Sequence, residues 1–369
     1  MKPLKLVTVL LTLVMLLSLV LTGCGSSTQQ DQISATPQDD PNKVYKLKAN
    51  YYSVEKAPPG QGMQKACDLA TERSSGRLQF ETYYAGTLVN KNDTMAALKA
   101  GTIDIAIVEA TMLAEVTVLN KVFNALLKEP PPDRHANTKA FRELIKTVPE
   151  LNDELAKINM KWLSCFSLPG YNLHSVKKKV KSIDDIKGMK IEAHGDVANY
   201  INSVGGAAVE LDASDYYSGL ERNLVDAQMA HWPITVLYKI QELVTTHTIF
   251  GDNIDSGGLY APPMGSLINL DTWNSLPEDL QQILVECFEE GHDYSLNLDD
   301  IMFADAIQYV QDKGDTIYYI TGDLRKPFND AMDPILNAWF KECKDAGYDG
   351  EKVYNKMLEL QAKYAKENK

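Results

Sequence analysis

The stretch GMKIEAHG, residues 188–195, places a carboxylate near the end of a short strand that its apolar residues predict to be buried. Glu192 stands where an apolar residue would pack without loss of stability. Burying an unpaired charge is strongly destabilising, so a carboxylate at this position needs a partner. The partner is either a base of the protein, such as Lys190, Arg134 or another residue, or a bound ligand. Glu192 is therefore a candidate ligand-binding residue.

Signatures of the common catalytic centres are absent from the sequence, which has no G-x-S-x-G, no H-E-x-x-H, no P-loop and no glycine-rich dinucleotide turn. His194 and Asp196 lie in a predicted loop, where such residues more often form turns than metal sites. The cysteines after Cys24 have no CxxC or Cys/His metal spacing: Cys67, Cys165, Cys287 and Cys343. We therefore expect no enzyme, no metal and no cofactor, while a disulfide stays open.

The charge of the chain argues against nucleic acid as a partner. The 369 residues carry a net charge of −13, and no basic stripe is available to neutralise phosphates. The one local exception is VKKKVK, residues 176–181, which we interpret as a solvated loop.

The first residues have the pattern of an export signal. Lys2 and Lys5 precede an apolar run that ends in LTGC, residues 21–24, and the run falls short of the roughly 20 apolar residues of a spanning helix. The tetrapeptide resembles a bacterial lipobox, so we expect a signal peptide at 1–23 and a lipid such as palmitate on Cys24. Residues 24–43 are polar and lack periodicity, which predicts a flexible tether. The expected location is extracytoplasmic, anchored to the cell membrane by lipid.

The remaining chain alternates between strand-like and helix-like segments. The first series consists of strand 44–52, helix 60–76, strand 77–86, helix 92–101 and strand 102–110, and a second series begins at 161–168. This order predicts mostly parallel sheets covered by helices on both faces. About 325 residues suggest two domains, and two similar α/β units in an exported chain indicate a bilobed binding protein with its ligand in the cleft.

Several segments resemble, in the right order, motifs of the solute-binding proteins of TRAP (tripartite ATP-independent periplasmic) transporters, the DctP-like family. They are ERSSGRLQFETYYAGTL with MAALKAGTIDIAIVEA, then SIDDIKGMKI, SDYYSGLERNLVDAQ and INLDTWNSLPEDLQQIL. The resemblance extends from Val44 to about Asp345.

The resemblance implies a type II periplasmic-binding-protein fold, in which two α/β lobes joined by a hinge close over a ligand. It implies lobe I at 44–167 and about 258–297, lobe II at 168–257 and about 298–345, and a C-terminal helix at 346–369. The implied function is extracytoplasmic capture of a small organic solute for a TRAP permease. A lipoprotein that feeds a sensor or another transporter type, and an enzyme on a similar scaffold, stay open.

The sequence departs from the family where family members recognise an acid. Glu192 occupies the position after G-x-K-I that usually carries an arginine, and Asn172 appears at a second position that is often basic. Glu109 matches a position of polar pocket residues. Two unpaired carboxylates in one cleft would resist closure, so we hypothesise a cationic amine as ligand.

Aromatic residues near these positions suit a cation, because an aromatic face holds an ammonium group by about 0.5 to 2 kcal/mol. The candidates are Tyr51, Tyr52, Tyr84, Tyr171 and Trp232. Tyr51 and Tyr52 point to opposite faces of a strand, so we expect at most one of them in the cleft.

Other interpretations of the candidate residues stay open. Trp232 is also compatible with packing at the hinge, and His231 and His194 with structural hydrogen bonds. Tyr217 matches a family tyrosine, with the helix core as the competing assignment. An organic acid held by backbone amides and histidine, or a neutral aromatic or hydroxylated solute, remains an alternative to the amine.

Overall fold

A computed structural model describes residues 42–367. The predicted signal peptide at 1–23, the predicted lipidation site Cys24 and the predicted tether up to residue 41 lie outside the described residues. Within the described part of the chain, no helix has the length and apolar character needed to cross a membrane.

The first lobe is built on a five-stranded sheet. In spatial order its strands are β2 (Leu78–Tyr84), β1 (Tyr45–Tyr51), β3 (Ile105–Glu109), β10 (Pro263–Asn269) and β4 (Met160–Ser167). Both faces of β3 are buried: Ile105 and Ile107 pack with α1 (Pro58–Arg73) and α10 (Glu278–Lys313), while Ala106 and Val108 pack on the other side. Burial on both faces explains why this strand is a continuous apolar run.

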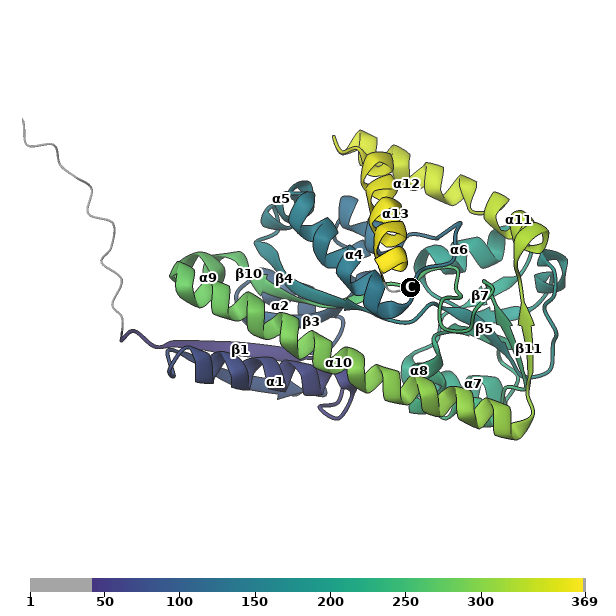
Figure 1. Cartoon of the computed structure of the whole chain (residues 1–369), viewed down its shortest axis with the longest axis horizontal. Coiled ribbons are helices and arrows are strands. Elements are labelled where there is room, and N and C mark those ends of the chain that lie inside the picture. The colour runs from purple at the N-terminus through teal and green to yellow at the C-terminus, as the bar shows by residue number, and fades with distance from the viewer. Residues whose placement is uncertain (1–41, 368–369) are drawn as a thin grey trace, which may run out of the picture. The chain divides into compact units, whose positions relative to one another are not determined.

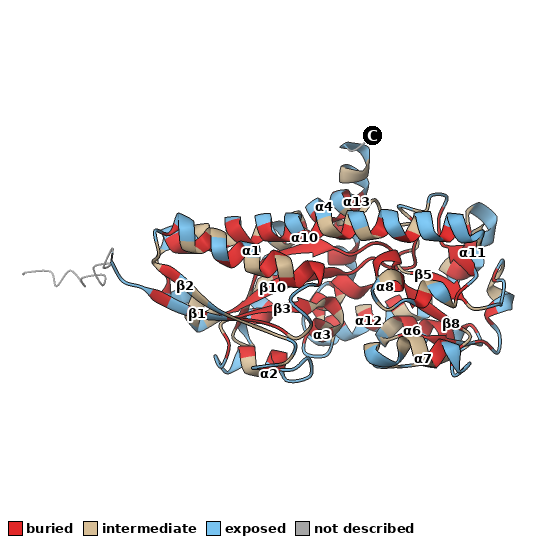
Figure 2. Cartoon of the chain, turned by 90° about the horizontal axis from the view of Figure 1, so that it is seen from below, coloured by how far each residue is buried: buried red, intermediate tan, exposed pale blue. Residues whose placement is uncertain are grey.

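The second lobe is built on a six-stranded sheet. Its strands, in spatial order, are β11 (Thr316–Tyr319), β9 (Thr246–Ile249), β5 (Asn172–Ser175), β8 (Ala227–Ala230), β6 (Lys190–Glu192) and β7 (Ala207–Val209). Its main helices are α6 (Gly195–Ser203), α7 (Tyr216–Glu221) and α8 (Trp232–Leu237). In both lobes the inner strands lie in the buried layer, as Figure 2 shows in red, whereas the edge strands β2, β7 and β11 are partly exposed.

Each sheet contains one strand that runs against the mostly parallel arrangement expected from the sequence. β10 is antiparallel to β3 and β4, and β5 is antiparallel to β8 and β9. Both strands follow a segment that crosses from the other sheet without an intervening helix, residues 250–262 and 168–171. Because only a helical crossover returns the chain in the parallel direction, a direct crossing produces an antiparallel strand.

The 36-residue helix α10 joins the two lobes along one side. It packs on α1 in the first lobe and on α8 in the second, and Figure 1 shows it passing from one to the other. The helix ends at Lys313 because Gly314 takes a left-handed conformation with φ +76°, which favours glycine. The predicted change of lobe near residue 297 thus falls within one continuous helix.

The C-terminal helices lead back from the second lobe to the first. They are α11 (Gly322–Asp330), α12 (Asp333–Asp345) and α13 (Gly350–Glu367). Phe328 accepts a hydrogen bond from Tyr200 of α6, whereas α13 packs on α4 (Arg134–Thr147) of the first lobe. The four cysteines of the described residues are buried and free: Cys67, Cys165, Cys287 and Cys343.

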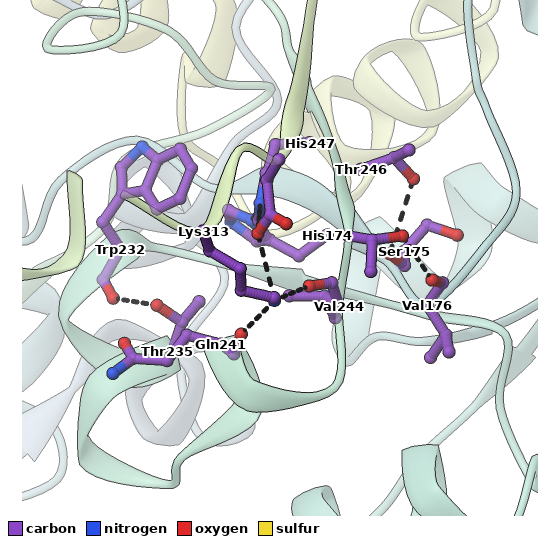
Figure 3. Close-up of polar contacts among 12 residues, drawn as sticks. His174, Ser175, Val176, Trp232, Thr235, Gln241, Val244, Thr246, His247 and Lys313 are labelled. Carbon is purple, nitrogen blue, oxygen red and sulfur yellow. Dashed lines mark hydrogen bonds and ion pairs between the residues drawn. The ribbon is translucent and has the colours of Figure 1, made fainter. Parts of the chain in front are cut away.

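A buried polar chain runs through the second sheet, and Figure 3 shows its members around His174 and His247. The two Nδ1 atoms lie 2.8 Å apart, and the Nε2 of His174 lies 3.2 Å from the Ala230 carbonyl oxygen. The Nε2 of His247 lies 3.2 Å from Asp315 Oδ2, which also pairs with Lys313 at 3.1 Å. Burial lowers the pKa of both imidazoles, most strongly that of His174.

Candidate functional site

Glu109 lies at the end of β3 and is held by three side chains of the first lobe. Its carboxylate accepts hydrogen bonds from Tyr52, from Lys91 Nζ at 2.9 Å and from Thr111 Oγ1 at 3.1 Å. Burial raises the pKa of this carboxyl, but Lys91 and the three hydrogen bonds outweigh burial and leave the pKa below its usual value. Glu109 is therefore an ionised carboxylate with its own cation.

Glu192 ends β6, is 2% exposed, and has His194 as its partner. His194 Nε2 lies 2.7 Å from Glu192 Oε1. Burial raises the pKa of Glu192, and the adjacent Glu192 carboxylate raises the pKa of His194. The base is thus neither Lys190, which is exposed, nor Arg134, which pairs with Asp300.

Both carboxylates act on the same three tyrosines. Burial raises the pKa of Tyr171, Tyr216 and Tyr260, and the negative charges of Glu109 and Glu192 raise it further. The hydroxyls therefore stay protonated and available as hydrogen-bond donors. These tyrosines define the candidate site, since they lie within electrostatic reach of one carboxylate from each lobe.

Ring contacts arrange these tyrosines against one another and against a histidine. The ring of Tyr171 lies 4.4 Å from that of Tyr260 and 5.1 Å from that of His231. Tyr216 contacts Tyr238 edge to face at 5.4 Å, and its hydroxyl is 3.5 Å from His194 Nε2. The site thus combines aromatic faces with hydroxyl groups.

Neither Glu109 nor Glu192 is left without a cation, which corrects the picture of two unpaired acids. Lys91 pairs with the first and His194 with the second. The positive charge of Lys91 also lowers the pKa of His194, so the two cations lie within electrostatic reach of each other. The repulsion on which the amine hypothesis depended is therefore offset within the protein.

His231 and Trp232 follow β8, and each carries a buried nitrogen that has no hydrogen-bond partner in the described part of the chain. His231 Nδ1 and Trp232 Nε1 have no hydrogen-bond partner within residues 42–367, and neither does Oε1 of the nearby Gln228. Burial lowers the pKa of His231 to about 3, so its imidazole is neutral. Because a buried polar atom is destabilising without a partner, His231 Nδ1 and Gln228 Oε1 are suited to contact with water or a ligand.

Trp232 is fully buried and packs with Phe303 and with the rings of His174 and His247, as the packing interpretation expects. A ligand contact by Trp232 stays a prediction.

Two of the predicted site residues have other surroundings. Asn172 is fully buried, and its side chain bonds the backbone of Gly170, Gly257 and Phe250 in the segments that cross between the lobes. Burial and the charges of Glu242 and Glu221 raise the pKa of Tyr217. A ligand contact by either residue stays a prediction.

The two tyrosines at the end of the first strand lie against each other, and burial and the charge of Glu109 raise the pKa of both. Tyr52 donates to Glu109, while the ring of Tyr51 packs edge to face on it at 5.0 Å. Which of them contacts a ligand stays a prediction. Tyr84, an expected aromatic wall, donates instead to Gln64 of α1 at 2.9 Å.

The site residues that the sequence analysis missed are Lys91, Tyr216, Tyr238 and Tyr260. Tyr216 had a signal, because it precedes Tyr217 in a short helix whose rotational phase the sequence leaves open. Lys91 had none, since it reaches Glu109 from a loop 18 residues earlier in the chain.

Comparison with known proteins places the chain in a family. The model of the bacterial extracellular solute-binding proteins, family 7 (DctP), matches residues 49–342. The chain is 24% identical over 295 residues to the 2,3-diketo-L-gulonate-binding periplasmic protein YiaO of Escherichia coli (strain K12). The alignment covers 78% of this chain and 84% of that protein. It is 21% identical over 302 residues to the C4-dicarboxylate-binding protein DctB of Bacillus subtilis (strain 168), covering 79% and 81%.

Solved structures share the fold. A TRAP solute-binding protein from Rhodoferax ferrireducens T118, in complex with copurified benzoate, aligns with a TM-score of 0.74 and 22% identity over 88% of this chain and 100% of that one. A TRAP periplasmic solute-binding protein from Chromohalobacter salexigens with bound D-glucuronate aligns with a TM-score of 0.72 and 17% identity, covering 85% and 99%.

These likenesses confirm the predicted type II periplasmic-binding-protein fold with two α/β lobes. Because the family model matches most of the chain, this protein belongs to the bacterial extracellular solute-binding proteins of family 7, the DctP-type solute-binding proteins of TRAP transporters, which are binding proteins and not enzymes.

Proposed function

We propose that this protein captures a hydroxylated organic acid between its two lobes and delivers it to a TRAP-type membrane permease. The observation that carries the proposal is that each lobe brings one cation and one carboxylate to the same tyrosines, Lys91 with Glu109 and His194 with Glu192. A ligand carboxylate bridges the two cations, and its charge reduces their mutual repulsion.

Hydroxyl groups on the acid match the acceptors of the site. Glu109 and Glu192 accept hydrogen bonds from ligand hydroxyls, and Gln228 Oε1 is a buried acceptor without a hydrogen-bond partner among residues 42–367. The faces of Tyr171 and Tyr260 pack against the body of the ligand. The names of two relatives agree with this class: one binds 2,3-diketo-L-gulonate and one was solved with D-glucuronate.

A cationic amine, the ligand first hypothesised, is the second candidate. Its support is that two carboxylates act on the same tyrosines. To bind between them, however, an ammonium group must displace Lys91 or His194 from an existing ion pair. An organic acid needs no such exchange.

A thermal-shift panel tests the ligand class on the protein produced without its predicted signal peptide. The panel contains D-glucuronate, benzoate, succinate, putrescine, choline and D-glucose. A ligand present at about 100 times its Kd adds roughly 2.7 kcal/mol to the stability of the folded state. We expect the largest rise in Tm with D-glucuronate. Stabilisation by putrescine or choline alone would contradict the proposal that the ligand is an acid.

Delivery to a permease is tested by transport. We expect uptake of the labelled acid only in cells that produce both this protein and its TRAP permease subunits. Binding of the acid without any permease-dependent uptake would favour the alternative, in which the protein feeds a sensor or another transporter type. A permease gene beside the gene of this protein supports the first arrangement.

We propose that Cys24 carries the lipid that holds the protein at the membrane. Support comes from the order of charged start, apolar run and LTGC tetrapeptide in residues 1–24. Growth with an alkyne-tagged palmitate should label the wild type and leave Cys24→Ser unlabelled. Equal labelling of both proteins would place the lipid elsewhere.

A further inference from the structure

The two direct crossings between the lobes are paired with each other. Tyr171, in the crossing from β4 to β5, donates from its N–H to Tyr260 O at 2.9 Å and accepts from Leu259 N at 3.1 Å. A third segment joins them, because Leu127 N donates to Leu259 O at 2.7 Å. These three backbone segments form the hinge ribbon, which comprises residues 126–128, 168–171 and 250–262.

The guanidinium of Arg325 donates hydrogen bonds to four backbone carbonyl groups of this hinge ribbon. Arg325 of α11 donates to Leu127 O and Lys128 O at 2.9 Å each, to Gly258 O at 3.1 Å, and to Phe250 O. The side chain is buried and donates no hydrogen bond to a carboxylate within residues 42–367. Burying a charge with carbonyl partners alone is expensive, so these contacts hold a specific backbone arrangement.

Asn172 holds the same ribbon through its amide group. Its Nδ2 donates to Gly170 O and Gly257 O at 3.1 Å each, and its Oδ1 accepts from Phe250 N at 2.9 Å. Arg325 and Asn172 therefore bind the carbonyl and the N–H of one residue, Phe250, between β9 and β10.

Glycines allow the crossings to approach this closely. A Cβ at Gly170 would lie 1.9 Å from Gly257 O, so no other residue fits there without movement of the backbone. Gly258 has φ +156°, at the edge of the region that favours glycine. The ribbon is thus tightly packed at the points about which the lobes turn.

We propose that Arg325 is the positioning residue of the hinge, the group that fixes the angle at which the two lobes meet. The inference rests on the proposed function in one respect, that the lobes close over a ligand. Arg325 lies on α11, which follows the last strand of the second lobe, whereas Leu127 and Lys128 belong to the first-lobe segment of the ribbon. Rotation of one lobe against the other moves the guanidinium relative to these carbonyls. One planar guanidinium satisfies all four only in a narrow range of lobe angles, because its donors have a fixed geometry.

The test measures the distance between the lobes without a ligand. Spin labels are attached through Lys99→Cys in the first lobe and Arg222→Cys in the second, both exposed, in the mature chain carrying Cys24→Ser. Double electron–electron resonance should show a distance distribution at least twice as broad for Arg325→Met as for the wild type. Arg325→Lys keeps the positive charge but has fewer hydrogen-bond donors, so the width of its distance distribution should be intermediate.

The matched control is Arg142→Met. Arg142 is a partly buried guanidinium that donates to Cys165 O and Glu289 O and pairs with Asp293, none of which belongs to the hinge ribbon. We expect a lower Tm but an unchanged distance distribution. A distribution for Arg325→Met that superposes on that of the wild type overturns the proposal, whatever the change in Tm.

Two further readouts separate this proposal from others. If Arg325→Met does not fold, Arg325→Lys decides: a distribution identical to the wild type overturns the proposal, and a broadened one supports it. With D-glucuronate as the probe, we expect at least tenfold faster dissociation from Arg325→Lys. If D-glucuronate does not bind the wild type, the proposed ligand fails, and the unliganded distances still decide the role of Arg325.

Discussion

The carboxylates of Glu109, at the end of β3, and of Glu192, at the end of β6, differ in the basic residue that pairs with each. Glu109 is held by a lysine, and its pKa lies below the usual value, so this half of the site stays ionised near neutral pH. Glu192 is held by a histidine, and the pKa values of Glu192 and His194 are both raised. The first lobe therefore pairs its carboxylate with a lysine, and the second pairs its carboxylate with a histidine whose charge depends on pH.

Because of this difference, we expect Lys91 to contribute most to the affinity for an acid and His194 to make that affinity depend on pH. Lys91 pairs with Glu109 in the first lobe, whereas His194 in the second lobe loses its charge as the pH rises through its raised pKa. An acid should thus bind more tightly in mildly acidic than in alkaline medium. The following variants remove one half at a time.

The largest effect is expected for Lys91→Met. The variant loses the ammonium group that pairs with Glu109 and leaves Glu109 to repel the ligand carboxylate, so the affinity for D-glucuronate should fall about 100-fold, or roughly 2.7 kcal/mol. Calorimetric titration measures the change. Lys99→Met, an exposed lysine of α2 (Thr94–Lys99) in the same lobe, is the control and should bind like the wild type. Equal affinity for both variants would remove Lys91 from the site.

Glu192→Gln should weaken binding in a pH-dependent way. Without the carboxylate, the pKa of His194 returns toward 6.5, so the imidazole is mostly neutral at pH 7.5 and charged at pH 5.5. We expect about tenfold weaker binding of D-glucuronate at about pH 7.5 and near-normal binding at about pH 5.5. An amine ligand would instead lose binding at both pH values, so the same titration separates the two ligand classes.

The buried histidines of the second lobe should respond to pH in the opposite sense. The pKa values of His174 and His247 are lowered from 6.5, so the unfolded chain takes up protons that the folded chain refuses as the pH falls below about 6.5. Stability should therefore decrease as the pH falls from about 7 to about 5. Urea unfolding at several pH values checks this.

His247→Asn tests whether the buried pair causes this loss of stability. The slope of stability against pH should become shallower in this variant than in the wild type. His135→Asn is the control, because the pKa of His135 is raised by its hydrogen bond to Asp300. An unchanged slope for His247→Asn would show that other groups cause the acid sensitivity.

The smallest effect separates two adjacent tyrosines. Tyr216→Phe removes a hydroxyl 3.5 Å from His194 and should weaken binding of D-glucuronate three- to tenfold, about 1 kcal/mol for one hydrogen bond. Tyr217→Phe should leave binding unchanged, since its surroundings are Glu242 and Glu221. The reverse result in calorimetric titrations would return Tyr217 to the site.

Much of the fold follows from local patterns, and the exceptions have a physical reason. The apolar run at 102–110 predicts a buried strand, and β3 indeed occupies Ile105–Glu109 with both faces buried. The directions of β5 and β10 escaped prediction because the crossings between lobes, not the residues of the strands, determine them. Strand direction depends on long-range connections that propensities do not encode.

The candidate site shows the same division between local and distant information. The pairing of Glu192 with His194 was accessible, because extended residues two positions apart point to the same side and His194 keeps an extended backbone. Lys91 and Tyr260 come from a loop and a crossing, so only the folded chain brings them to Glu109 and Glu192.

The most direct test of the account is a crystal structure of the protein with the acid that gives the largest thermal shift. The account predicts both lobes in contact with the acid, and its carboxylate within hydrogen-bonding distance of Lys91 Nζ and His194 Nε2. A ligand that contacts one lobe only, or whose carboxylate lies away from both cations, would contradict it.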